Sequence, residues 1–141
     1  MSRLRILGRA TSSNVRKVLW TADLCGIDYE HEPWGLPLRD PKVPEFLELN
    51  PNGTVPVIVD GGYVLWESGA IMRYLGETRR SELWPADPRE RGLVDQWLTW
   101  QSTELVPSWM YAVTALQAKN PDFADPVEIP ESIAKWSARM R

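Results

Sequence analysis

The chain has 141 residues, of which 43% are hydrophobic and 25% are charged, and these values suit one compact domain plus part of a second. Its net charge of −3, without any block of basic residues, gives no reason to expect a nucleic-acid partner. Its apolar runs are far shorter than the roughly 20 residues that cross a bilayer, so we expect no membrane partner and a cytoplasmic location.

The cysteine and histidine content excludes several kinds of site. The single cysteine, Cys25, cannot form an intrachain disulfide, and with the single histidine, His31, it provides too few ligands for an ordinary metal site. His31 lies in an alternating stretch typical of a strand. An exposed histidine is therefore a simpler interpretation of His31 than a catalytic one.

The first half of the sequence alternates between strand and helix patterns. A strand is predicted over 3–8, and the polar cluster 11–14 favours a helix start directly after it. The apolar face of this helix includes Cys25, which we interpret as a core residue rather than a nucleophile, and Gly26 marks the helix end. The elements predicted next are a strand (27–32), a short helix (45–49), two strands (55–60 and 63–66) joined by Gly61-Gly62, and a helix from Ser68.

This order of elements specifies a mixed sheet flanked by helices. The first strand–helix–strand crossover requires parallel pairing, whereas a two-residue turn requires antiparallel pairing. The fold class we expect is an α/β, thioredoxin-like domain over residues 1–78. A linker over 79–88 and an all-α, incomplete helical-bundle domain over 89–141 would follow it.

The region after the linker is predicted to be helical. A long helix starts near Arg89, Pro107 should kink or interrupt it, and helical composition resumes over 109–118. After a loop over 120–130, a last amphipathic helix carries an apolar stripe of Ile133, Trp136 and Met140. Because this stripe has few partners, we interpret the region as a truncated domain. The alternative is that dimerisation or domain swapping buries the stripe.

The segment 50–56, Asn-Pro-Asn-Gly-Thr-Val-Pro, places a proline just inside a predicted strand. Central strands rarely tolerate proline, so Pro56 indicates either an edge position or a cis bond. In that case the N–H and C=O of Val55 would be free to pair with an extended peptide. A plain turn before a strand explains the motif equally well.

Two polar clusters precede predicted helices. Ser68 can cap the helix that it begins, while the N–H groups and dipole at that end favour an anionic ligand and Glu67 could pair with an amino group. The cluster 11–14 could donate a hydrogen bond to a thiolate and so lower the pKa of the thiol. Simple capping is the alternative for both clusters.

Together these motifs resemble, in order and spacing, the cytosolic glutathione transferases of the theta, phi and related bacterial classes. The resemblance covers residues 3–78 and continues more weakly to the end of the chain. One departure is Thr54, where relatives commonly carry a basic residue directly before the Val-Pro pair, so we expect weaker glutathione binding. The segments that carry the resemblance are 9–19, 49–57, 65–71 and 74–75.

The resemblance implies roles for individual residues. Ser12 occupies the position of the thiol-activating serine, and Asn14 that of a thiol-contacting asparagine in some bacterial members. Val55, before what would be a cis-Pro56, would pair with the cysteinyl backbone of glutathione. The other implied glutathione contacts are Glu67 and Ser68 at the γ-glutamyl end, Lys42 at the glycyl carboxylate, and Ser13 and Thr54.

The implied function is conjugation of the glutathione thiolate to a small hydrophobic electrophile, with glutathione as co-substrate, no other cofactor, and a homodimer as the assembly. The electrophile pocket would include Ala10, Trp109, Tyr111 and Val113, although aromatic residues in a helix can also be core. Two alternatives remain open. One is a glutathione-dependent disulfide reductase, suggested by Asn14, and the other is a non-catalytic glutathione-binding or interaction module.

Overall fold

The structure is a computed structural model that describes residues 3–117 and 119–141, apart from the side chain of Ser81. The chain divides into two compact units, Met1–Pro88 and Arg89–Arg141. Two parts of the predicted elements lie outside the described residues. They are the first two residues of the thioredoxin-like domain predicted over 1–78 and the last residue of the helix predicted over 109–118.

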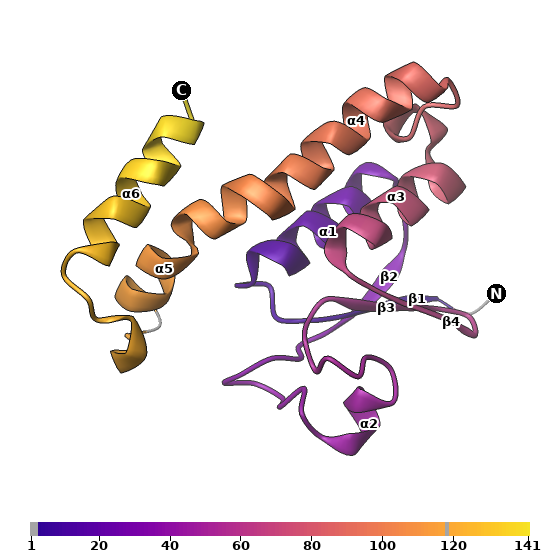
Figure 1. The fold of residues 1–141 in the computed structure, drawn as a ribbon. Coiled ribbons are helices and arrows are strands. Elements are labelled where there is room, and N and C mark those ends of the chain that lie inside the picture. Colours follow the sequence, from indigo (N-terminus) through magenta and orange to yellow (C-terminus); the bar gives the residue numbers. More distant parts are fainter. Residues whose placement is uncertain (1–2, 118) are drawn as a thin grey trace. The chain divides into compact units, whose positions relative to one another are not determined.

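The first unit is a four-stranded mixed sheet with helices on both faces (Figure 1). The strand order is β2-β1-β3-β4, in which β1 and β2 are parallel and the other pairs are antiparallel. The predicted crossover, hairpin and thioredoxin-like fold class are confirmed. The elements are β1 (Leu4–Leu7), α1 (Ser13–Leu24), β2 (Tyr29–Glu32), α2 (Pro44–Leu47), β3 (Val57–Asp60), β4 (Tyr63–Trp66), α3 (Ser68–Arg79) and a 3-10 turn (Ser81–Leu83).

The two faces of the sheet carry separate apolar clusters, because side chains alternate along each strand. Helices α1 and α3 lie on one face, and α2 lies on the other (Figure 1). The cluster under α1 and α3 consists of Leu4, Ile6, Val18, Ala22, Ile58, Ile71 and Leu75. The cluster on the α2 side consists of Leu7, Trp34, Phe46 and Val57.

The first helix ends where the sequence predicted. Gly26 has φ +62°, a left-handed conformation that glycine adopts without steric cost, and it directly follows the cap residue Cys25. Cys25 is only half-buried, so its assignment to the core is correct in part. His31 is exposed, as predicted, and its Nε2 lies 2.6 Å from the carbonyl oxygen of Gly8.

The second unit is helical throughout its regular elements. The predicted interruption near Pro107 takes the form of a π-helical stretch. The helix that follows it contains Pro107 in its first turn, where the backbone N–H that proline lacks is not required. The elements are α4 (Pro88–Trp100), the π-helix (Gln101–Leu105), α5 (Val106–Leu116), a 3-10 turn (Pro121–Phe123) and α6 (Glu128–Arg139).

The loop predicted over 120–130 is too long, because α6 already begins at Glu128. The Asp125 carboxylate accepts a hydrogen bond from the N–H of Val127 at 2.8 Å, and this bond organises the helix start. Pro130 is then in the first turn, where helices tolerate proline. Within the described part of the chain, no helix has the length and apolar character needed to cross a membrane.

Candidate glutathione site

The starts of α1 and α3 meet at one end of the first unit. The Ser68 hydroxyl donates to Asn14 Oδ1 in a long contact of 3.5 Å that joins the first turns of the two helices. Neither first turn contains an acidic residue. The N-terminal ends of both helix dipoles therefore favour an anionic group at this place.

Gly8 allows the loop before β3 to approach the same end of the sheet. A Cβ atom on Gly8 would lie 2.5 Å from Cγ2 of Val15, in the first turn of α1, and 3.2 Å from Cβ of Val55. Any side chain at position 8 would therefore push these elements apart. The start of α1, the start of α3 and the backbone of Val55 are thus brought together by residues far apart in the sequence.

Ser12 is the N-cap residue of α1 by position, but its hydroxyl makes no capping hydrogen bond. Its backbone is extended, with φ −74° and ψ 128°, and its carbonyl oxygen accepts from the N–H of Arg16 at 2.9 Å. The side chain is half-buried, whereas Ser13 and Asn14 are exposed. Since simple capping does not occupy the Ser12 hydroxyl, this hydroxyl can donate to a ligand.

The Val55-Pro56 peptide bond is cis, which decides between the sequence alternatives. β3 begins at Val57 rather than at Val55 and lies between β1 and β4, so Pro56 does not mark an edge strand. Among the described residues, no hydrogen bond is found for the N–H or C=O of Val55. These two groups can pair with an extended peptide ligand.

Asn50 holds this loop together, and sequence reasoning did not single it out. It is 1% exposed, and its Nδ2 donates to the carbonyl oxygen of Thr54 at 2.8 Å. Its Oδ1 accepts from the N–H of Asn52 at 3.1 Å. The Asn-Pro pair at 50–51 was a turn signal, but only the fold shows that the asparagine is buried.

Lys42 lies against the same loop. Its Nζ donates to the carbonyl oxygen of Asn52 at 2.7 Å, and the side chain is exposed. Gly53 has φ +58°, and a Cβ there would lie 2.9 Å from the carbonyl oxygen of Pro41. The lysine is thus positioned by the loop, and two of its three ammonium protons remain for a carboxylate.

Glu67 has an unusual backbone conformation at the start of α3. Its φ is 73° and its ψ is 114°, values that L-residues rarely adopt, and its side chain is exposed. Such strain costs on the order of 1–3 kcal/mol and occurs most often at functional sites. Burial lowers the pKa of Lys17 on α1, and the negative charge of Glu67 opposes this shift.

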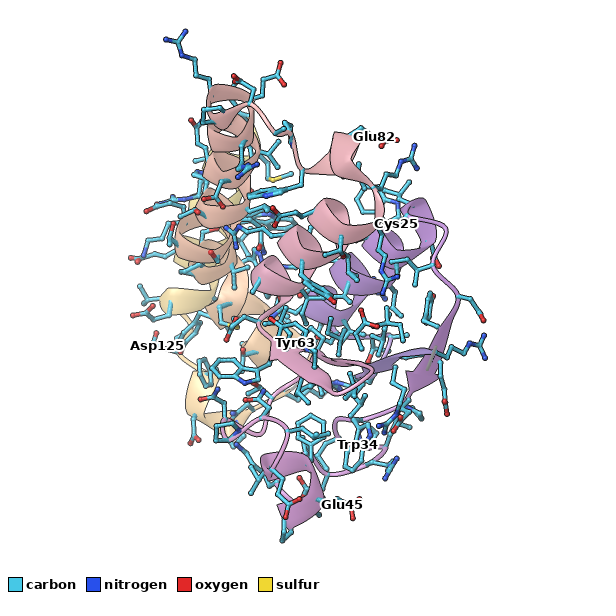
Figure 2. All side chains as sticks on the ribbon, turned by 90° about the vertical axis from the view of Figure 1, so that its right-hand side faces the viewer. Cys25, Trp34, Glu45, Tyr63, Glu82 and Asp125 are labelled. Atoms are coloured by element: carbon cyan, nitrogen blue, oxygen red, sulfur yellow. The ribbon has the colours of Figure 1, made fainter. Side chains whose placement is uncertain are left out.

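Arg9 is a second residue that the sequence did not indicate. Its guanidinium donates to the carbonyl oxygen of Leu36 at 2.7 Å and so fastens the segment 34–39 to the loop that precedes α1. Within this segment, Arg39 stacks over the Trp34 ring at 3.6 Å and pairs with Glu45 at 3.2 Å. Trp34 and Glu45 lie on the α2 side of the sheet (Figure 2).

The residues expected at an electrophile pocket belong to different units. Ala10 is exposed in the first unit, whereas Trp109, Tyr111 and Val113 are half-buried on α5. Tyr111 packs on Phe123 with ring centroids 5.1 Å apart, and its hydroxyl accepts from the N–H of Asp125 at 3.2 Å. Tyr111 therefore has a structural role within the second unit. No group of three or more potential metal ligands occurs among the residues that the structure describes.

Comparison with known proteins identifies the family. Residues 11–78 match the family described as the N-terminal domain of glutathione S-transferase. The chain is 31% identical over 138 residues to glutathione S-transferase GstB of Escherichia coli, and this alignment covers 96% of the chain and 66% of that relative.

Solved structures agree with the sequence match. One is a theta class glutathione S-transferase from Xanthomonas axonopodis pv. citri with glutathione bound, which shares 34% identity and a TM-score of 0.91 over 99% of this chain and 68% of that chain. A poplar glutathione transferase shares 26% identity and a TM-score of 0.87 over 99% of this chain and 67% of that chain. The chain belongs to the glutathione transferase family, with theta- and phi-like relatives.

Proposed function

We propose that this chain binds glutathione and presents its thiolate to a small hydrophobic electrophile. The observation that carries the proposal is the unpaired backbone of Val55 before cis-Pro56, which Gly8 brings close to the first turn of α1. A free peptide edge beside two helix N-termini suits a peptide ligand that carries carboxylates. Membership of the family supports the same assignment.

We assign each part of the glutathione tripeptide to different residues of the site. We assign the cysteinyl backbone to the N–H and C=O of Val55, and the γ-glutamyl carboxylate to Ser68 and the start of α3. Glu67 is then the partner of the γ-glutamyl amino group, because its exposed carboxylate directly precedes Ser68. Lys42 takes the glycyl carboxylate. Ser13 and Thr54, the other two assigned contacts, are both exposed.

The proposed reaction takes place at the thiol of glutathione. The Ser12 hydroxyl, which caps no helix N–H, donates to the sulfur and favours the thiolate over the thiol. The thiolate attacks the carbon of the electrophile, a carbon–sulfur bond forms, and the leaving group departs with the electron pair. The protein contributes thiolate stabilisation and proximity, and it forms no covalent bond itself.

The test is a pair of neighbouring serine variants. Ser12→Ala should abolish most conjugation of glutathione to an aryl halide while glutathione affinity, measured by calorimetry, stays nearly intact. Ser13→Ala is the comparison variant and should retain much more activity than Ser12→Ala, because Ser13 is assigned a contact with glutathione and not with its sulfur. If Ser12→Ala turns over normally, the activating role moves to Ser13 or Asn14.

An absorbance titration of the bound thiolate separates the remaining alternatives. A glutathione thiol pKa well below its free value of about 8.5 would show binding and activation together. Binding without a pKa shift would favour a non-catalytic module, and turnover of a small disulfide but not of an aryl halide would favour a reductase. Asn14 is the residue to mutate in the reductase case, because it occupies the position of a thiol-contacting asparagine in some bacterial relatives.

We also propose that the protein works in the cytoplasm as a homodimer. The single cysteine is compatible with a reducing compartment. Large apolar side chains are exposed on α4 and α6, including Trp97 at 62% and Trp136 at 43%, and a second copy could bury them. Sedimentation equilibrium tests this, and a monomer at all concentrations would contradict it.

A further inference from the structure

The carbonyl oxygen of Gly8 lies where the parallel ladder between β1 and β2 stops. Leu7 is in register with Glu32, and the N–H of Gly8 continues the ladder by donating to the carbonyl oxygen of Glu32 at 2.8 Å. In a parallel ladder the next bond would run from the N–H of Trp34 to the carbonyl oxygen of Gly8. The N–H of Trp34 instead turns back to the carbonyl oxygen of Glu32 at 2.9 Å. Among the described residues, the Gly8 carbonyl is thus left without a backbone donor.

The side chain of His31 takes the place of the missing ladder bond. Its Nε2 lies 2.6 Å from the carbonyl oxygen of Gly8. A carbonyl oxygen only accepts, so Nε2 carries the proton in this contact and the imidazole donates. Tyr29, two residues earlier on the same face of β2, packs on the apolar cluster under α1 and α3. An apolar residue at position 31 would continue that packing but could not hold the Gly8 carbonyl.

Gly8 lies between the two parts of the proposed site that must be aligned with each other. Its missing Cβ would meet Val15 in the first turn of α1 at 2.5 Å and Val55 at 3.2 Å. The peptide of Gly8 therefore sets the separation between the start of α1 and the backbone that we assign to the cysteinyl part of glutathione. A shift of this peptide would move the two parts relative to each other.

The loop from Gly8 to Ser12 carries this alignment to the serine hydroxyl. The next two carbonyl oxygens after that of Gly8 accept from the N–H of Ser12 at 3.0 Å and from Nε of Arg16 at 2.9 Å. Both donors belong to α1 or to its cap, so they hold the loop to the helix. His31 holds the backbone of the loop to the sheet. The guanidinium of Arg9 adds a second tie on the same side, but it acts through a side chain and not through the backbone.

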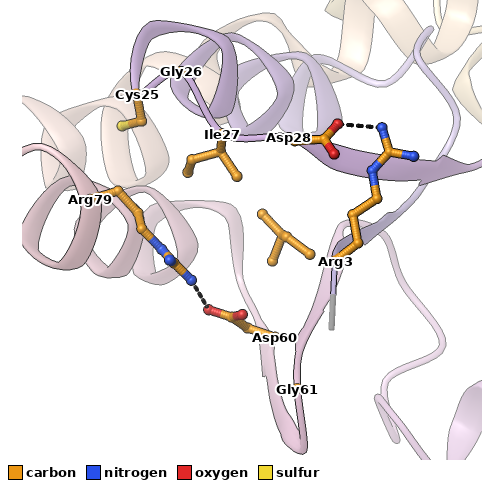
Figure 3. Close-up of a pocket in the computed structure, with 9 residues that line it drawn as sticks. Arg3, Cys25, Gly26, Ile27, Asp28, Asp60, Gly61 and Arg79 are labelled. Atoms are coloured by element: carbon orange, nitrogen blue, oxygen red, sulfur yellow. Dashed lines mark hydrogen bonds and ion pairs between the residues drawn. The ribbon is translucent and has the colours of Figure 1, made fainter. Parts of the chain in front are cut away.

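The opposite ends of the same two strands are joined in a different way. There Arg3, directly before β1, pairs with Asp28, directly before β2, and both line a cavity whose other ion pair is Arg79 with Asp60. Figure 3 shows these two pairs. Each of them joins one side chain to another, whereas His31 bonds to a peptide group. The cavity end therefore offers a matched control for the site end.

We propose that His31 is a positioning residue for the thiol-activating serine, Ser12. Through the carbonyl group of Gly8 it holds the loop so that the Ser12 hydroxyl faces the sulfur of a glutathione molecule bound at Val55. The inference rests on the proposed function, because it takes the activation of the sulfur by Ser12 as given. His31 serves as neither acid, base nor ligand in the reaction.

The variant His31→Leu removes the donor. A neutral hydrogen bond changes an equilibrium about three- to tenfold, so the pKa of the bound glutathione thiol should rise by about half a unit to one unit. Below that pKa, turnover of an aryl halide should fall by about the same factor, while glutathione affinity, measured by calorimetry, should change less than about twofold. Well above the pKa, turnover should approach that of the unchanged protein, because the thiol is ionised in both. An equal loss of turnover at every pH, or a parallel loss of affinity, would show a merely structural role and overturn the proposal.

Two further variants separate the donor from the side chain as such. His31→Gln keeps an N–H donor at a similar reach and should restore the thiol pKa and the turnover to within about twofold. Arg3→Leu removes the bond to Asp28 at the far ends of β1 and β2 and should leave the thiol pKa unchanged. A glutamine variant that behaves like the leucine variant, or an equal pKa rise in Arg3→Leu, would overturn the proposal.

The unmodified protein distinguishes a failure of this inference from a failure of the proposed function. If it does not lower the pKa of the glutathione thiol, the proposed function fails and the inference fails with it. If the unmodified protein and His31→Leu lower this pKa equally, only the inference fails. His31 is the single histidine of the chain, so nitrogen-15 NMR of the labelled imidazole tests the contact even if the variants do not fold. In the neutral ring the proton should be on Nε2, and a proton on Nδ1 would overturn the proposal.

Discussion

The two units of this protein are held together by different means. Among the described residues, the first unit buries twelve apolar side chains in total, which lie on the two faces of its sheet. The second unit buries only one apolar side chain, that of Ala112. The second unit instead joins α5 to α6 through buried polar contacts. The Ser132 hydroxyl donates to the carbonyl oxygen of Ser108 at 2.8 Å and accepts from the N–H of Ala112 at 3.3 Å.

The difference shows where each unit derives its stability. Hydrophobic burial is non-directional and scales with area, so the first unit is stabilised by its core as a whole. A small polar bridge depends on the position of single atoms, and one substitution can remove it. We therefore expect large cavity effects in the first unit and sharp, local effects in the second.

The largest effect is expected for a core truncation. Ile58→Ala in β3 removes a side chain that is 0% exposed and should lower the free energy of unfolding by about 2–5 kcal/mol. Ile133→Ala on α6, where the isoleucine is 40% exposed, should cost less than about 1 kcal/mol. Urea unfolding measures both values. Equal losses would show that the second unit has a comparable core.

The next effect concerns the loop that carries Val55. Asn50→Ala leaves the Thr54 carbonyl and the Asn52 N–H without their buried partner, and it should cost about 1–3 kcal/mol. It should also weaken glutathione binding, because the position of Val55 depends on this loop. Calorimetry would measure the glutathione affinity, and urea unfolding would measure the stability. Asn120→Ala is the control, because it removes a hydrogen bond from the N–H of Asp122 in the second unit. Unchanged glutathione affinity in Asn50→Ala would show that this loop does not contribute to glutathione binding.

In the second unit, Ser132→Ala should remove the bridge between α5 and α6 at a cost of about 1–2 kcal/mol. The effect is local, so hydrogen exchange of the Ala112 amide is the appropriate measurement and should accelerate about tenfold. Ser137→Ala, at an exposed position of the same helix, is the control and should leave exchange unchanged. Equal acceleration in both variants would contradict the bridge.

Backbone strain offers a smaller contrast between the units. Glu67 and Lys119 both have positive φ, of 73° and 51°, so glycine at either position should raise the free energy of unfolding by about 0.5–1 kcal/mol. Only Glu67→Gly should reduce glutathione affinity, since only this carboxylate belongs to the proposed site. Reduced affinity in Lys119→Gly as well would indicate an indirect effect.

The smallest effect is a pH dependence in the first unit. Burial raises the pKa of Glu32, but hydrogen bonds from Arg5 and Trp34 outweigh burial and hold this pKa below its usual range. A lowered pKa stabilises the folded state above the unfolded value of about 4.3, and this stabilisation is lost as the pH falls through the folded value.

Unfolding free energies at pH 3 to 7 should therefore fall less steeply on the acid side in Glu32→Gln than in the unchanged protein. Glu131→Gln on α6 removes an exposed ion pair with Lys135 and should leave the profile as it was. A Glu32→Gln profile that coincides with that of the unchanged protein would show that this carboxylate does not contribute.

The sequence predicted the features that depend on local pattern. Alternation along the strands, the stop at Gly26 and the turn at Gly61-Gly62 are properties of short windows, and the structure confirms them. The proline at 56 left an edge strand, a cis bond and a plain turn before the strand as alternatives. The cis bond and the central place of β3 in the sheet, which only the structure shows, decided among them.

The remaining features depend on contacts between distant residues. The approach of Val55 to the first turn of α1 requires the absence of a side chain at Gly8, and Arg9 reaches a carbonyl group in the segment 34–39. Neither of these two contacts produces a periodic pattern in the sequence. The early start of α6 was missed for a different reason, because a side chain outside the helix, that of Asp125, determines it.

The loop over residues 50–54 separates positions that are fixed from one that is free to vary. Asn50 is buried, and Gly53 has no room for a side chain between the loop and Pro41. Thr54 contributes its carbonyl oxygen to the buried bonds, and its exposed side chain adds a longer contact in which Oγ1 accepts from Asn50 Nδ2 at 3.2 Å. Evolution or a protein engineer can therefore exchange residue 54, for example for a basic residue, and tune the affinity for an anionic ligand at the cost of one side-chain hydrogen bond, because the bond to the backbone carbonyl remains.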